Sequence, residues 1–515
     1  MAVRRVLPVA LAAVLALGVA VPVASSADSP PVSGGTLVEQ CQANLGPVPE
    51  AGPRACRTGQ SVVWGTAAAC RTPLRAAPAP DAPEQCAVID GRPVSEARVA
   101  AYERSWVHRA LSLQRGLDEA APLFEEQLPH THNTFNSSAY QIPTDGSAPS
   151  YYPTLTNQDP NQPYSITDQL RMDVRAIEID VHWVPSPYGN PSTGGFWVTM
   201  CHGNGQDPTA SGNYVHVGCT YDRPFQDGLA EVAKWLRANP DQFLLLYLEN
   251  QLNGSLQAHQ QAAQIISQQL GTLVYRPSTG QPCAPMPLDT SRATMKKTTE
   301  AQVLIVGNCG PGEWGTWVHE RAPLWDESGS PSDYPAACAD DQAARQQHTS
   351  FRRYFEDSTW LTAMLGGTQH ITPAVTAAMV RCGVNIIGMD QLIPEDPRLA
   401  ALVWSWAQDE PRAGAGDCAA QGGDARFHAG DCGQRLHFAC TDTAGNWYVT
   451  RATGKWDRGF KACASEFPGT AFKTPANGYR NALLTGAKPS GVGDVWLNYR
   501  RSQSGWSANL ASAKG

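Results

Sequence analysis

The sequence predicts an α/β protein whose main domain is a (β/α)8 barrel of the TIM type. From about residue 130 to residue 408, short apolar runs alternate with stretches of helical periodicity, which is typical of repeated βα units. Some of these runs, such as residues 242–250, are continuously apolar, as expected of strands that are buried on both faces. No glycine-rich phosphate loop follows an early strand, so the sequence favours a barrel over an open doubly wound sheet.

The elements of this domain follow from local patterns. We expect strands at residues 175–184, 196–203, 242–250, 301–308 and 383–390, and helices at residues 94–120, 224–240, 372–383 and 396–408. The apolar residues on one face of the second helix are Phe225, Leu229, Val232 and Leu236. The third helix has the clearest ends, because Thr372 suits the N-cap, Pro373 the first helical position and Gly383 the C-cap.

The rest of the chain divides into three parts. Residues 1–27 are interpreted as a secretory signal peptide, cleaved near Ala27, because a basic start precedes an apolar run that ends in small residues. A leader rich in Pro and Ala, with four cysteines, follows over residues 28–93. The barrel domain is then expected over residues 94–411, and a separate β-rich module with four cysteines over residues 412–515.

Charge and cysteine content restrict the function. The net charge is −8, and it falls to −10 once the two arginines of the signal peptide are removed, which excludes a broadly basic nucleic-acid-binding surface. The 14 cysteines all follow the signal peptide, and an even number in an exported chain predicts disulfides. Candidate partners among sequence neighbours are Cys201/Cys219, Cys283/Cys309 and Cys432/Cys440. We therefore expect a secreted monomer that does not bind nucleic acid.

Three ionisable side chains alternate along the strand expected at residues 175–184. Glu178, Asp180 and His182 share one face of it, because successive side chains of a strand point to opposite sides. Charges in a row on a buried strand are costly unless they line a site. We interpret this face as part of an active site, and a surface edge strand is the structural alternative.

Two further strands end in polar residues. Glu249 and Asn250 close the run at 242–250, and His202 closes the one at 196–203. Barrel enzymes place their chemistry at the C-terminal ends of the strands. A helix N-cap or a loop position is the structural alternative for Glu249.

The C-terminal ends of the strands surround one opening of the barrel, which we call the mouth. If the polar residues meet there, they would form an oxygen-rich cluster. Its members would be Asn133, Glu178, Asp180 and Glu249, with three negative charges. Carboxylates that are close together raise one another's pKa unless a cation intervenes, and oxygen-only ligation suits calcium better than zinc or magnesium. His132 and His202 would then be available for proton transfer or charge stabilisation. For His130, a metal-binding pair with His132 and hydrogen bonding to a neighbouring ligand both remain open.

Four motifs carry a family resemblance. The segments THNTFN, RAIEID, CHGNG and LLLYLEN, between residues 131 and 250, resemble the X-box of calcium-dependent phosphoinositide-specific phospholipase C in order and in spacing. The resemblance implies a PLC-like barrel in a secreted bacterial-type member, with calcium held by the four oxygen-bearing residues. It also implies that His132 steadies charge on phosphorus and that His202 protonates the departing diacylglycerol oxygen. Glu178 would take the proton from the inositol 2-hydroxyl, and Arg175, His130 and Asn250 would contact the substrate.

The implied substrate is phosphatidylinositol at a membrane surface, and the products are diacylglycerol and a cyclic inositol phosphate, with or without its hydrolysis to the open form. Residues 301–310 lack the lysines that hold ring phosphates in animal members, which favours the unphosphorylated lipid. Glycerophosphodiester and sphingomyelin phosphodiesterases of the same superfamily are alternatives, and a non-catalytic surface-binding protein is a third. The module at 412–515 resembles a C-type-lectin-like domain whose halves are in inverted order. That resemblance implies a carbohydrate or cell-surface ligand, and a disulfide-stapled cap without a ligand is the alternative.

Overall fold

The computed structural model describes residues 96–508 with internal gaps. The gaps are residues 138, 140–160, 186–194, 203, 209–213, 218–222, 278–280, 328–330, 332–333, 335–349 and 358–370. The expected signal peptide and leader lie outside the described residues, and so does Cys219 of the candidate pair Cys201/Cys219.

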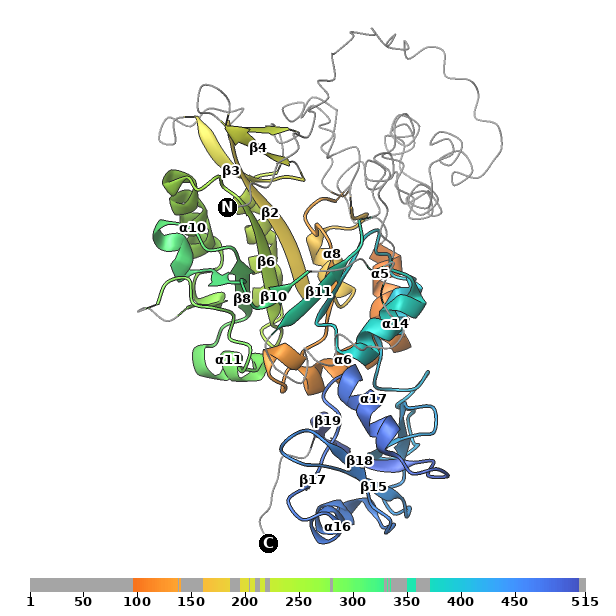
Figure 1. The fold of residues 1–515 in the computed structure, drawn as a ribbon. Helices are drawn as coiled ribbons and strands as arrows, with labels where there is room; N and C mark the ends of the chain where they lie inside the picture. The colour runs from red at the N-terminus through yellow and green to blue at the C-terminus, as the bar shows by residue number, and fades with distance from the viewer. Residues whose placement is uncertain are drawn as a thin grey trace, which may run out of the picture. The chain divides into compact units, whose positions relative to one another are not determined.

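Eight parallel strands follow one another in chain order around the curled sheet of the first domain (Figure 1). They are β1 (Leu128–Thr131), β2 (Ala176–Pro185), β6 (Leu244–Gln251), β8 (Val303–Gly307), β9 (His319–Glu320), β10 (Trp325–Asp326), β11 (Phe351–Phe355) and β12 (Ile386–Met389). β12 pairs with β1, so the order returns to its start. Among the described residues no strand pairing joins β9 to β10. The predicted barrel is confirmed as a TIM-like α/β fold whose sheet stays open at this seam.

Helices cover the outside of the curled sheet (Figure 1). They are α5 (Glu96–Glu103), α6 (Trp106–Asp118), α8 (Ile166–Arg171), α9 (Phe225–Ala238), α10 (Leu256–Gln269), α11 (Arg292–Thr299), α14 (Pro373–Cys382) and α15 (Pro397–Leu402). The predicted ends of α14 are confirmed: the Thr372 side chain accepts a hydrogen bond from the Val375 N–H, and Gly383 has φ 80°. The apolar face predicted for α9 is also confirmed, since its four residues are fully buried.

Three elements differ from the sequence prediction. β3 (Phe196–Met200) is no barrel strand, because it pairs antiparallel with β2 and forms a hairpin that leads the chain back toward the barrel. The helix expected at 94–120 is two helices, since Ser105 caps the second one by accepting from the His108 N–H. The last helix ends at Leu402, where the chain turns toward the C-terminal module. Three further strands, β4 (Asn204–Pro208), β5 (Tyr214–Val217) and β7 (Val274–Tyr275), also lie outside the series of eight.

The alternation of the barrel strands separates two packed cores. The residues that pack inside the barrel include Leu128, Ala176, Leu245, Tyr247, Leu304, Val306 and Ile386. The residues that pack against the helices include Ile177, Ile179, Leu246, Leu248 and Ile305. Because Ala176 faces inward and Ile177 outward, Glu178 and Asp180 also point into the barrel.

The C-terminal module is β-rich, as predicted. Its strands are β13 (Cys418–Gln421), β14 (Phe427–Gly430), β15 (His437–Thr441), β16 (Trp447–Val449), β17 (Ala471–Phe472), β18 (Val495–Ser502) and β19 (Gly505–Ala508), and its helices are α16 (Gly459–Glu466) and α17 (Gly478–Ala487). The disulfides Cys418–Cys432 and Cys440–Cys463 cross-link the module. The predicted pair Cys432/Cys440 is therefore wrong, because Cys440 lies beneath α16, which carries Cys463. In the barrel domain the predicted pair Cys283/Cys309 is confirmed.

The module contacts the barrel at the end where the strands begin. The Gly478 N–H donates to Gln127 Oε1 at 2.6 Å, and the Asn477 side-chain amide donates to the Glu125 carbonyl at 2.8 Å. Glu125 and Gln127 directly precede β1, so the C-terminal ends of the strands lie at the opposite end of the barrel. None of the helices in the described part of the chain is long and apolar enough to cross a membrane.

Candidate active site

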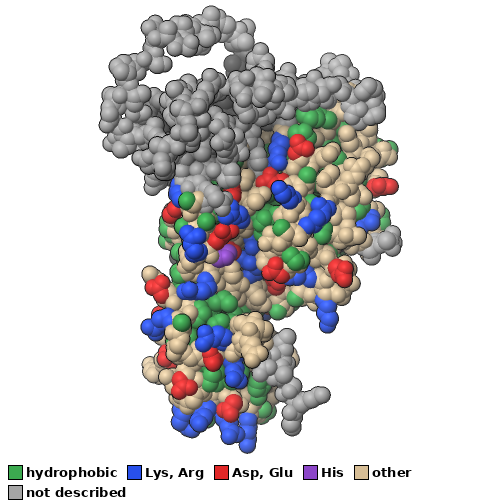
Figure 2. Space-filling model, turned by 180° about the vertical axis from the view of Figure 1, so that it is seen from behind, with side chains coloured by type: hydrophobic (Ala, Val, Ile, Leu, Met, Phe, Trp, Pro, Cys, Tyr) green, Lys and Arg blue, Asp and Glu red, His purple; other side chains and the backbone are tan. Residues whose placement is uncertain are grey.

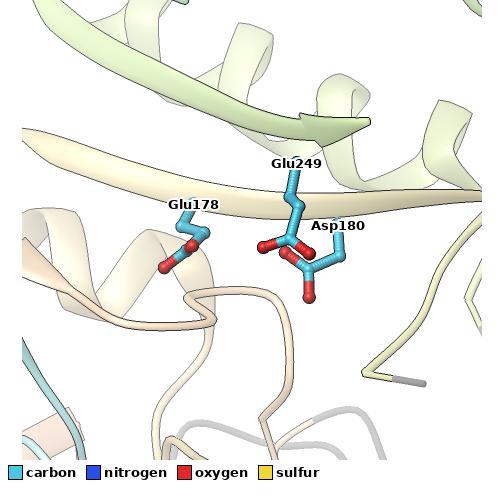
Figure 3. Close-up of side chains that lie close together, drawn as sticks. All are labelled: Glu178, Asp180 and Glu249. Atoms are coloured by element: carbon cyan, nitrogen blue, oxygen red, sulfur yellow. The ribbon is translucent and has the colours of Figure 1, made fainter. Parts of the chain in front are cut away.

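Three carboxylates meet inside the barrel near the C-terminal ends of two neighbouring strands. Glu178 and Asp180 lie on β2 and Glu249 on β6, and the parallel register pairs Asp180 directly with Glu249. One oxygen from each carboxylate lies within 4.8 Å of the others. Figure 3 shows the three side chains pointing into the same space from the two strands.

This cluster holds more negative charge than its surroundings neutralise. Burial raises the pKa of Asp180 well above its ordinary value, and the charges of Glu249 and Glu178 raise it further. Burial and the charge of Glu178 likewise raise the pKa of Glu249. Asp180 is only 5% exposed, and its Oδ1 has no hydrogen-bond partner among the described residues. A hard divalent cation bound by these oxygens would neutralise the excess negative charge and would contact the unpaired oxygen. The donor set therefore fits calcium.

Arg353 on β11 compensates one of the three charges. Its guanidinium forms a buried ion pair with Glu178, and it reaches Glu327 at 2.7 Å. Burial alone would raise the pKa of Glu178, but the Arg353 charge, together with His130 and His132, outweighs burial and holds that pKa well below its usual range. Glu178 is therefore a firmly ionised carboxylate, whereas Asp180 binds a proton readily in the absence of a cation.

The turn after β1 places Asn133 beside the cluster. Asn133 has φ 45°, a left-handed conformation that Asn tolerates better than most residues, and its backbone N–H donates to Glu178 Oε2 at 3.1 Å. One residue on, the Thr134 hydroxyl accepts from the Glu178 N–H at 2.9 Å. The turn is thus fastened to β2 beside the first carboxylate.

His132 lies in the same turn and pairs with an aspartate from β12's C-terminal end. Its Nδ1 is 3.2 Å from Asp390 Oδ1, and its ring packs on Phe355. Burial would lower the pKa of His132, but the charge and hydrogen bond of Asp390 raise it to about 9. The imidazole is therefore held as a cation at neutral pH.

His202 reaches the site from the hairpin rather than from a barrel strand. Because β3 runs antiparallel to β2, the chain returns to the mouth, where the Cys201 N–H donates to the Asp180 carbonyl at 3.2 Å. Asn136 Nδ2 lies 3.2 Å from His202 Nδ1 and donates to Asn161 Oδ1 at 2.7 Å. Burial, together with the positive charge of His132, lowers the pKa of His202 to about 4. The two histidines therefore differ in charge at neutral pH.

The remaining predicted residues have other surroundings. His130 is fully buried, with Nδ1 donating to the Ala176 carbonyl at 3.0 Å and Nε2 accepting from Arg353 Nε at 3.3 Å. The structure does not bring Arg175 or Asn250 to the carboxylates. Arg175 precedes β2 at the far end of the barrel and donates to the Leu170 carbonyl at 2.7 Å. Asn250 points outward, and its amide lies 3.0 Å from His259 Nε2 on α10.

Sequence reasoning missed three residues of this site: Asp390, Arg353 and Asn161. Asp390 had a usable signal, because it closes an apolar strand in the same way that Glu249 does. Arg353 had a weaker one, since it is a charged residue within a short run of aromatic residues. Asn161, whose amide donates to Asp390 Oδ1 at 3.1 Å, lies in no recognisable motif.

Comparison with known proteins gives a family and several relatives. The family model for the Rv2075c PI-PLC-like domain matches residues 90–396. The uncharacterised protein Rv2075c of Mycobacterium tuberculosis strain H37Rv is 38% identical over 439 residues, which are 82% of this chain and 84% of the relative. The uncharacterised protein MT2135 of strain CDC 1551 matches to the same extent.

Solved structures with a similar chain course include two bacterial enzymes. The phosphatidylinositol-specific phospholipase C of Listeria monocytogenes is 12% identical, with a TM-score of 0.35 over 56% of this chain and 98% of that chain. The enzyme of the same name from Staphylococcus aureus is 13% identical, with a TM-score of 0.36 over 58% and 98% of the two chains. On the match of the family model and of the mycobacterial relatives, this chain belongs to the Rv2075c PI-PLC-like domain family.

Proposed function

We propose that the protein is a secreted, calcium-dependent phosphodiesterase that cleaves the glycerophosphate bond of phosphatidylinositol. Its products are diacylglycerol and a cyclic inositol phosphate. Membership of a PI-PLC-like family supports the phosphodiesterase class. The observation that carries the proposal is the meeting of Glu178, Asp180 and Glu249 inside the barrel, with two histidines at the same mouth.

The carboxylates and Asn133 hold the ion in this proposal. Bound calcium would lower the pKa of the attacking hydroxyl and offset negative charge on the phosphate. Arg353 and the Asn133 N–H hold Glu178 in place from two sides, so the cluster is organised before the substrate arrives.

The histidines have separate tasks. His132 is the cation that faces the developing charge on phosphorus, and Asp390 keeps it protonated. His202 donates a proton to the departing diacylglycerol oxygen. Because the Asn136 amide donates to His202 Nδ1, the proton of the neutral ring is carried on Nε2. The negative phosphate of the substrate favours further protonation of His202 as the lipid binds.

The proton acceptor for the inositol 2-hydroxyl is one of the carboxylates. The sequence resemblance favours Glu178, and this assignment stays a prediction. In the absence of a cation Arg353 lowers the pKa of Glu178 and burial raises that of Asp180, but a bound ion would lower the pKa of each carboxylate that it contacts.

The nature of the product tests this function. Only a substrate with a hydroxyl next to the phosphate can cyclise, so phosphorus NMR of phosphatidylinositol vesicles incubated with the protein and calcium should show a cyclic phosphodiester. Vesicles of phosphatidylcholine, whose headgroup has no such hydroxyl, are the control and should remain intact. Release of phosphocholine, or of an open-chain monoester without a cyclic precursor, would contradict the proposal.

A further inference from the structure

The charge of the chain is divided unevenly along its length. Residues 412–515 contain 13 Lys and Arg against 7 Asp and Glu, a net charge of +6. The preceding 411 residues contain 26 Lys and Arg against 40 Asp and Glu, a net charge of −14. The C-terminal module is therefore a basic unit on an acidic protein, and such an asymmetry points to a partner of opposite charge.

The basic side chains gather on one face of the module, around α16 and the short helix η7 (Trp456–Arg458). We call this surface the basic face. It consists of Arg435, Arg451, Lys455, Arg458, Lys461 and Arg500, all exposed. Two contacts place the remaining arginines beside residues 451–461. Arg435 donates to the Thr453 carbonyl at 2.8 Å, and the Arg500 guanidinium lies over the Trp456 ring, 5.6 Å from its centre. Figure 2 shows Lys and Arg side chains at the end of the molecule where Figure 1 places α16.

Three of these six cations have no side-chain hydrogen bond, ion pair or ring contact with any residue that the structure describes. Among the described residues, Arg451, Lys455 and Lys461 make no side-chain hydrogen bond or ion pair. Arg458 has only a loose, exposed ion pair with Asp457 at 3.9 Å. The nearby carboxylates of Asp431 and Glu466 are engaged with backbone N–H groups at 3.0 and 2.6 Å. The face therefore keeps a surplus of positive charge for a ligand.

The basic face points away from the barrel. Along β18, Leu497 and Tyr499 belong to the core shared with the barrel, and the Tyr499 hydroxyl donates to the Leu113 carbonyl at 3.3 Å. Trp496, on the other side of the same strand, packs with Trp456 beneath α16. The module's sheet thus separates the barrel from the basic face. Because the module also contacts the barrel end opposite the mouth, one flat membrane cannot lie against both the basic face and the mouth.

The surroundings of the cations narrow the class of partner. Single-stranded nucleic acids need exposed aromatic rings on which bases stack, but Trp456 is buried and Phe460 is partly buried. A membrane-inserting surface needs exposed apolar side chains, and the large one found among the described residues is Leu256, which lies on α10 of the barrel. Long, flexible cations spaced three or four residues apart along residues 451–461 suit a linear chain of repeated anionic groups.

We propose that the basic face binds an anionic polysaccharide. The proposal goes beyond the phosphodiesterase function and does not depend on it. The contact is electrostatic, so it weakens as salt screens the charges. It would hold the enzyme on an acidic glycan while the mouth, at the other end of the barrel, stays open to substrate.

The intact protein tests the proposal with dextran sulfate and with uncharged dextran, which share one backbone. We expect binding of dextran sulfate at physiological ionic strength and none of dextran. The variant Arg451→Glu, Lys455→Glu, Arg458→Glu and Lys461→Glu should bind dextran sulfate at least about tenfold more weakly. A second variant with Gln at the same four positions removes the charge without reversing it, and it should also bind more weakly, by a smaller factor.

A matched control separates this face from net charge. The variant Arg104→Glu, Arg109→Glu, Lys234→Glu and Lys297→Glu changes four exposed cations of the barrel domain, so its net charge shifts by the same amount. It should bind within about threefold of the parent protein. Equal losses in both charge-reversal variants, undiminished binding by the Gln variant, or tighter binding of a DNA duplex than of dextran sulfate would each overturn the proposal.

Discussion

Replacing Asp180 with Asn should make the metal-free protein more stable and should abolish its response to calcium. In the absence of an ion, the buried Asp180 carboxyl is opposed by Glu249 and Glu178 and lacks a partner for Oδ1. The pKa of this carboxyl is 3.8 in the unfolded chain and is raised on folding. The folded state therefore loses stability as the pH rises from 3.8 to the folded-state pKa, and the full penalty applies at any pH above the folded-state pKa. The amide carries no charge, so it should remove this penalty. Leaving a buried polar group unsatisfied typically costs about 1–3 kcal/mol, and we expect a stabilisation of that order near neutral pH.

Glu178→Gln is the matched control, with the opposite expected effect on the metal-free protein. Glu178 forms a buried ion pair with Arg353, and breaking such a pair costs about 3–5 kcal/mol because a buried charge is left without its partner. In the proposed site, each variant lacks one calcium ligand. The parent protein should gain about 2.7 kcal/mol at a calcium concentration one hundred times the dissociation constant, and neither variant should gain a comparable amount.

Thermal denaturation in chelator and in calcium measures all of these terms. The melting temperature in chelator should rise for Asp180→Asn and fall for Glu178→Gln, and calcium should raise it only in the parent. A decrease for Asp180→Asn in chelator would refute the electrostatic reasoning. An undiminished calcium response in both variants would refute the ligand assignment.

Two other substitutions test separate parts of the structure. His202→Ala should reduce turnover of natural lipid by about two to four orders of magnitude. It should cost far less on a substrate whose leaving group needs no proton, and equal losses in the two steady-state assays would reject its role as the acid. Gly388→Ala would place a Cβ 2.8 Å from Phe355 Cβ and 2.9 Å from His130 Cδ2. It should therefore destabilise the barrel by about 1–3 kcal/mol in chemical denaturation, whereas an unchanged midpoint would show that the interior there is loosely packed.

The sequence was most informative where the pattern within one strand determines the geometry. The alternation Glu178–Asp180 and the position of Glu249 at the end of an apolar run were enough to predict that the three carboxylates meet, because neighbouring parallel strands bring their C-terminal ends together. The helix ends at Thr372 and Gly383 were predictable for the same reason, since capping depends on a few adjacent residues.

Features that depend on pairing between distant segments were not predictable from one sequence. The direction of β3 was missed, because an apolar run looks the same in a hairpin and in a barrel strand. Arg353 pairs with Glu178 across 175 residues, and no local pattern encodes that contact. The pairing of Cys440 with Cys463 rather than Cys432 likewise depends on how α16 packs on β15.

The dependence of phosphatidylinositol hydrolysis on free calcium tests the central claim most directly. In a series of buffered calcium concentrations, the account predicts a rate that is negligible in chelator and rises to saturation as the carboxylate site fills. A full rate in chelator would contradict the claim that Glu178, Asp180 and Glu249 act by holding a calcium ion.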